Sequence, residues 1–344
     1  MSDVRHIDWD LRTRPTLAAV AGRLSPSWRG YFRIAADGGR NVSTNATSSA
    51  EWGGVLPGTL YERPGTDPSA AALRTPAEAT AALDRHGVDE AVLNPTVAPR
   101  VSGLASARWS AELARAINDW TVEEWLPADE RLRASILVST RDPRLAAQEI
   151  ERLGAHERTA QVVLGYPQAL LGDRSLDPLY GAAAEHGLPV LLQAGGAYTG
   201  ANKGLSRIGH PLSAYEAERA WIHAAQPHLT SLVAQGVFAR HPGLRLVLSG
   251  FGIAWLPSLL WELDAAYDAG DAVPPARVER RPSETLREHV RFTTAGLERP
   301  ADPGRLVDLL RLVDGADLLL FGSGARGPDD PEAAALLAAL APVA

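Results

Sequence analysis

The chain alternates short runs of apolar and β-branched residues with longer amphipathic stretches, and this alternation limits the folds open to it. In most runs the hydrophobic residues are near-continuous, which is typical of strands buried on both faces. The eight runs are Val4–Trp9, Val88–Asn94, Leu132–Val138, Ala160–Gly165, Leu188–Gln193, Leu244–Ser249, Val290–Thr294 and Asp317–Gly322. Eight buried strands separated by helices predict an α/β fold, a parallel (β/α)8 TIM barrel, in a single domain spanning residues 1–344.

Amphipathic helices are predicted between the runs. They lie near Thr75–Arg85 and at Pro143–Leu153, Leu212–Arg240, Pro257–Tyr267 and Pro303–Leu312, and Pro227 is a candidate break in the third. An Ala-rich helix is expected at Pro331–Leu340. A long loop insertion at about 36–71 is rich in Gly, Ser, Thr, Asn and Pro. A loop of this length is either a lid or binding element, or an insertion without a role.

The composition restricts the chemistry. There is no cysteine, which excludes disulfides, iron–sulfur clusters and cysteine nucleophiles, so a metal would have to bind to carboxylates and the nine histidines. A net charge of −7 without a basic run argues against nucleic acid or an anionic membrane as a partner. No signal peptide and no apolar run of the roughly 18–20 residues that span a bilayer is evident, so a cytoplasmic protein is expected.

Several motifs resemble one family when they are read in order. Ile7–Pro15 (IDWDLRTRP) looks like an opening I-D-x-D-x-H-x-x-P, Gly187–Gln193 (GLPVLLQ) like G-L-P-v-x-x-H, and Gly236–Asp264 is the longest match. Across nearly its full length the chain resembles the amidohydrolase superfamily, in the branch related to aminocarboxymuconate-semialdehyde decarboxylase. The resemblance implies an amidohydrolase-like barrel, an active site at the carboxyl ends of the strands, and a homodimer.

The resemblance also implies a set of metal ligands, which this chain lacks. Relatives supply a His or Asp and then a His from the first strand, a His from the fifth, and an Asp from the eighth, while a His or Glu from the sixth assists. The corresponding positions here are Asp10 and Arg12, Gln193, Gly324, and Ser249 or Gly250. A guanidinium cannot coordinate a cation, and Asp10 alone does not make a site. We therefore expect no metal and no other cofactor.

The histidines do not offer a replacement. His6 is predicted inside the first strand, and His86, His186 and His241 fall in helix-to-strand connections on the face opposite the chemistry. His223 and His228 do not share one face of their helix. His210, after a Gly-rich stretch that follows the fifth strand, is the one histidine expected near the pocket. It is either a general acid/base or a hydrogen-bonded loop residue.

We predict that the barrel mouth carries the site. The candidate catalytic residues are Asp10, Arg12 and His210, and the candidate substrate-binding residues are Gln193, Tyr198, Ser249, Phe251, Trp255, Ser323 and Arg326. Asp10 with Arg12 is either a base and anion clamp or a structural ion pair.

Three functions remain open from the sequence. The first is a metal-independent enzyme that carries out cyclisation, dehydration, carbon–carbon lyase or isomerisation chemistry on a small organic substrate, in specialised metabolism for example. The second is an inactive pseudoenzyme that binds a ligand or an active paralogue. The third is an ordinary metal-dependent hydrolase or decarboxylase, if the alignment of ligands is wrong.

Overall fold

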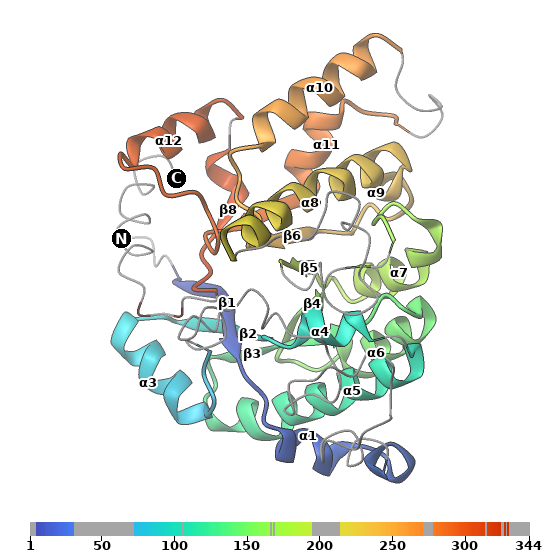
Figure 1. Ribbon diagram of the computed structural model, residues 1–344, viewed down its shortest axis with the longest axis vertical. Helices are drawn as coiled ribbons and strands as arrows, with labels where there is room; N and C mark the ends of the chain where they lie inside the picture. Colours follow the sequence, from blue (N-terminus) through green and yellow to red (C-terminus); the bar gives the residue numbers. More distant parts are fainter. Residues whose placement is uncertain are drawn as a thin grey trace.

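The computed structural model describes residues 5–30, 72–104, 106–165, 167, 169–194, 214–270, 278–313, 315–324, 327 and 329. Eight parallel strands pair in the order β1 to β8, and helices surround them (Figure 1). The barrel closes between β8 and β1, where Trp9 N donates to Phe321 O over 2.8 Å and Gly324 N to Asp10 O over 2.9 Å. The strands are β1 (Ile7–Thr13), β2 (Glu90–Pro95), β3 (Leu132–Val138), β4 (Thr159–Leu164), β5 (Val190–Gln193), β6 (Leu246–Ser249), β7 (Val290–Thr293) and β8 (Leu319–Leu320). The predicted TIM barrel is confirmed.

The helices follow the strands as the sequence predicts. They are α1 (Leu17–Arg23), α3 (Pro76–His86), α4 (Ala98–Gly103), α5 (Ala107–Trp120), α6 (Pro143–Gly154), α7 (Asp177–Glu185), α8 (Ala214–Ala234), α9 (Val237–Arg240), α10 (Leu256–Asp268), α11 (Pro282–His289) and α12 (Gly304–Arg311). Side-chain caps fix several of their starts, as at α3, where Thr75 and Glu78 form a capping box. Among the described residues, no helix combines the length and apolarity that a membrane span needs.

Two details differ from the sequence predictions. The first strand runs on to Thr13, because a register shift between Asp8 and Leu11 lets it keep pairing with β2, and His6 lies exposed just before it. Helix α8 continues through Pro227, and the break comes at Gly236, whose φ of +64° starts α9. The loop at 36–71 and the helix at Pro331–Leu340 lie outside the described residues.

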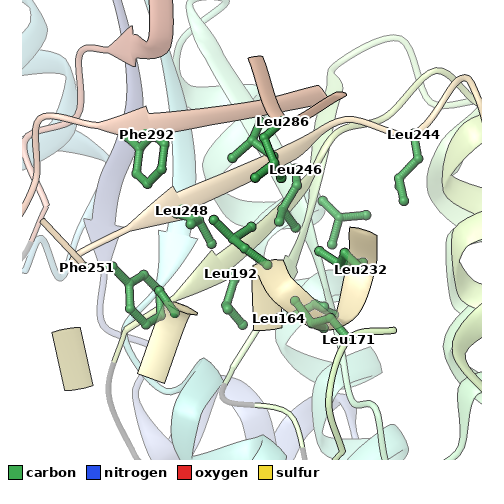
Figure 2. Packing of buried hydrophobic residues seen from close by; sticks show 14 of the residues in the cluster. Leu164, Leu171, Leu192, Leu232, Leu244, Leu246, Leu248, Phe251, Leu286 and Phe292 are labelled. Carbon is green, nitrogen blue, oxygen red and sulfur yellow. The ribbon is translucent and has the colours of Figure 1, made fainter. Parts of the chain in front are cut away.

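One apolar cluster fills the space between the outer face of the strands and the helices. Figure 2 shows side chains of β5, β6 and β7 in it, such as Leu192, Leu248 and Phe292. Phe251 is only 1% exposed in this cluster, and Trp255 packs edge-on against Phe292 with ring centroids 5.9 Å apart. This placement favours a packing role for Phe251 and Trp255 over the substrate contact expected from the sequence.

The opposite side chains of the strands belong to a second cluster. Leu137, Val163, Leu191 and Val247 come from four successive strands and pack with residues of α1, α4 and α5. Gly165, directly after β4, approaches α4 so closely that a Cβ there would overlap the Ala98 carbonyl oxygen. Helix α4 therefore lies against the carboxyl ends of β3 and β4, at the face where barrel enzymes carry their sites.

Candidate functional site

The inward side of β1 carries a buried ion pair. Arg12 Nε donates to Asp10 Oδ1 over 2.6 Å and Arg12 Nη2 to Asp10 Oδ2 over 2.7 Å. The two residues are two positions apart, so both side chains lie on one face of the strand. Asp10 is fully buried and Arg12 is 7% exposed. This two-pronged contact is the strongest geometry between an arginine and a carboxylate.

Two further side chains complete the environment of Asp10. Asn94 Nδ2 donates to its Oδ1 over 2.8 Å, and the Ser249 hydroxyl donates to its Oδ2. Each oxygen of Asp10 thus accepts two hydrogen bonds. Because no lone pair is left for a substrate proton, the geometry favours a positioning role for Asp10 over the role of a base.

A chain of uncharged polar groups holds Asn94 in turn. Ser135 Oγ donates to Asn94 Oδ1 over 2.6 Å, and Gln161 Nε2 donates to the same oxygen over 3.0 Å. The three residues come from β2, β3 and β4, and all are buried. The sequence reasoning missed this network. Its only signal in the sequence is a polar residue among the apolar residues of each of these three strands.

Asp8 lies two residues before Asp10 on β1. Its Oδ1 accepts from Asp10 N over 2.9 Å and from Ser323 N over 3.1 Å, and it is 1% exposed. Burial penalises the charged form and raises the pKa of Asp8 to about 6, although these hydrogen bonds oppose the shift. Asp8 is therefore a buried group that titrates close to neutrality.

The raised pKa of Asp8 makes stability depend on pH. Between about pH 4 and pH 6 the folded chain holds a proton on Asp8 that the unfolded chain has released, so the free energy of unfolding falls as pH rises. A shift of this size corresponds to about 3 kcal/mol. We compare the free energy of unfolding of Asp8→Asn with that of the unmodified protein. The difference should shift in favour of the variant by about 3 kcal/mol between pH 4 and pH 7. Urea denaturation of both proteins across this range measures the difference, and a difference independent of pH would contradict it.

The structure brings some of the predicted site residues together. Gln193 and Ser249 are paired at the ends of β5 and β6, and the Ser323 hydroxyl lies 3.4 Å from the Asp10 carbonyl oxygen, so all three line the inner side of the carboxyl-terminal face with Asp10 and Arg12. Tyr198, His210 and Arg326 lie outside the described residues. Their expected roles stay predictions.

The residues at the positions where the resemblance implies metal ligands do not fit a divalent cation. The Arg12 guanidinium covers one edge of the Asp10 carboxylate, and Gln193 Oε1 is a weak neutral ligand. Gly324, at the eighth strand, has a φ of +64° and no side chain to offer. Within the described part of the chain, no group of three or more His, Asp or Glu residues could hold a metal ion.

Comparison with known proteins shows the family to which the chain belongs. The profile of the family described as Amidohydrolase matches residues 63–342, more than half of the sequence. The chain belongs to the amidohydrolase family. It is 29% identical over 259 residues to gamma-resorcylate decarboxylase of Rhodococcus jostii (strain RHA1), a match that covers 70% of this chain and 74% of the relative. The family resemblance predicted from the motifs, in the decarboxylase-related branch, is confirmed.

Solved structures agree on the fold. The 5-carboxyvanillate decarboxylase LigW from Sphingomonas paucimobilis superposes with a TM-score of 0.66 at 20% identity, and the match covers 99% of both chains. Dihydroxybenzoic acid decarboxylase from Polaromonas sp. JS666, with bound manganese and the inhibitor 2-nitroresorcinol, gives a TM-score of 0.67 at 18% identity and covers 97% of this chain and 90% of that one. The manganese belongs to that protein.

Proposed function

We propose that this protein is a carbon–carbon lyase of the amidohydrolase fold, which decarboxylates a small hydroxylated aromatic acid without a resident metal ion. Relatives named as decarboxylases support the reaction type and the substrate class. Of the reactions expected from the sequence, carbon–carbon bond cleavage is the one with this support. Location in the cytoplasm and assembly as a homodimer remain predictions.

The observation that carries the proposal is the way Asp10 holds Arg12. The pair uses Nε and Nη2 of the guanidinium, while Nη1 makes no hydrogen bond with any described residue. Within the part of the chain that the structure describes, Arg12 is thus a fixed cation with a donor to spare, at a position where the family resemblance implies a metal ligand. Fixed positive charge in a site with little water stabilises negative charge that develops on a substrate oxygen.

This arrangement suits decarboxylation. The ring carbon that bears the carboxylate first takes up a proton, while the neighbouring hydroxyl loses its proton and becomes a carbonyl group. We propose His210 as the acid that delivers the proton to the carbon, because imidazole exchanges protons near neutral pH. The bond between this carbon and the carboxylate then breaks, CO2 leaves, and the electron pair restores the aromatic ring and returns negative charge to the neighbouring oxygen, which Arg12 stabilises.

The test is CO2 release from 2,6-dihydroxybenzoate and related hydroxybenzoates before and after dialysis against a chelator, with the metal content measured on the same samples. We expect turnover that survives chelation, and a loss of about 100-fold or more for Arg12→Lys, which keeps the charge but loses the fork. Manganese or zinc that stays near one per chain, with activity that follows it, would refute the metal-independent reaction.

One observation favours the pseudoenzyme as a second candidate. All four hydrogen bonds to the Asp10 carboxylate come from side chains of the described residues, as in a purely structural pair. Under this alternative the protein binds hydroxybenzoates and releases no CO2. If the unmodified protein turns over any substrate, and Arg12→Lys abolishes that turnover, the pseudoenzyme alternative is excluded.

A further inference from the structure

Buried polar atoms without a partner gather at one end of the barrel. Six of the ten buried side-chain atoms that lack a hydrogen-bond partner among the described residues lie there: Thr13 Oγ1, Thr140 Oγ1, Gln193 Oε1, Thr293 Oγ1, and Nε and Nη2 of Arg141. These residues end β1, β5 and β7 or directly follow β3. Since buried polar groups are nearly always paired, such a concentration indicates that a ligand or ordered water completes this end.

Arg141 is the charged member of this set. At the other end of the same strand, Arg131 binds Asp129 over 2.7 Å and Arg133 binds Glu90 over 3.1 Å. Arg141 has no such carboxylate among the described residues, although two of its three side-chain nitrogens are buried. Burial without a counter-charge lowers the pKa of Arg141.

The local sequence explains why Arg141 has no counter-ion. The next residue, Asp142, is the N-cap of α6, and its Oδ1 accepts from Arg144 N and Leu145 N over 3.1 and 3.3 Å. Its carboxylate is therefore committed to the start of the helix. Arg141 N donates to Ser139 Oγ over 3.3 Å, which ties the backbone of the loop to the end of β3. The fold thus holds a cation at the barrel mouth and directs the adjacent carboxylate elsewhere.

We propose that Arg141 binds the carboxylate of the substrate. A planar carboxylate matches the fork of a guanidinium and would partner the nitrogens that now lack a hydrogen bond. In this arrangement Arg12 and Arg141 divide the work: Arg12 stabilises the oxygen that gains charge, and Arg141 holds the group that is lost as CO2. The inference rests on the proposed function for the identity of the acid.

Binding measurements separate this role from a structural one. Isothermal titration uses 2,6-dihydroxybenzoate and resorcinol, the same ring without the carboxylate. We expect Arg141→Gln to weaken binding of 2,6-dihydroxybenzoate roughly 10- to 100-fold, the value of one charge-assisted contact, and to leave resorcinol unchanged. Arg144→Gln is the matched control, because it removes the same charge three residues away from an exposed position and should change neither affinity. The free energy of unfolding should not fall in Arg141→Gln, since its side chain has no hydrogen-bond partner to lose among the described residues.

The outcomes distinguish the two proposals. If the unmodified protein binds 2,6-dihydroxybenzoate through Arg141 and releases no CO2, the lyase proposal fails and the assignment of Arg141 stands. If the affinity for 2,6-dihydroxybenzoate is the same in Arg141→Gln, or if the unmodified protein binds no carboxylate probe, the assignment is wrong. Tighter binding of inorganic phosphate than of any carboxylate, lost in Arg141→Gln, would also overturn it in favour of a phosphorylated ligand.

Discussion

Replacing Arg12 by methionine is expected to lower the free energy of unfolding by about 3–5 kcal/mol. The substitution removes the two short contacts at 2.6 and 2.7 Å and leaves the Asp10 carboxylate without a cation at a position from which solvent is excluded. The hydrogen bonds from Asn94 and Ser249 remain, but they offset only part of the cost of burying a charge. Chemical denaturation of the purified variant measures the loss.

A double variant shows that the charge, and not the lost volume, causes the effect. Asp10→Asn combined with Arg12→Met removes both charges, and we expect it to recover at least half of the stability lost in Arg12→Met alone. Arg12→Lys should lie between, since it restores the charge without the fork. A loss below about 1 kcal/mol in Arg12→Met, within the range of exposed ion pairs, would show that Asp10 is not held as a buried carboxylate.

Gly324→Ala is the second substitution with a large expected effect. At φ +64° an alanine adopts an unfavourable backbone conformation, at a cost of about 1–2 kcal/mol. Its Cβ would also lie only 2.5 Å from Ala295 Cβ, and such overpacking adds about 1–3 kcal/mol. We expect a total loss near 3–4 kcal/mol in the free energy of unfolding.

Gly87 provides the matched control. It has a φ of +60°, but nothing lies within 4 Å of the position of its Cβ, so Gly87→Ala should cost only the backbone part, about 1 kcal/mol. Equal losses in the two variants would contradict the close approach of Gly324 to Ala295.

The fold could be predicted from the sequence because barrel strands are buried on both faces. Near-continuous apolar runs marked them, and Leu132–Val138 has the predicted bounds. The end of β1 could not be predicted, because Asp10 and Arg12 look like loop residues unless their mutual neutralisation is known. The predicted helix break at Pro227 was also wrong, because helix α8 continues through this proline and the break comes at Gly236.

The candidate site was only partly predictable. The family positions identified Asp10, Arg12, Gln193 and Ser249, but not what holds them. Asn94, Ser135 and Gln161 are 41 and 26 residues apart, and the parallel pairing of β2, β3 and β4 brings them into contact. The sequence holds one local indication for Arg141. An arginine directly before an Asp-Pro helix start has its nearest carboxylate already engaged in capping the helix.

The polar side of β1 also determines how this strand can pair. Side chains alternate along a strand, so a shift of β1 by one residue would turn Asp8, Asp10 and Arg12 towards the apolar side, where Leu11 packs near Leu83 and Leu93. Burying charges there without Asn94 and Ser249 would be prohibitively costly. The pair therefore discriminates against misregistered barrels while the chain folds, a role that it would keep even in a protein that has lost its activity.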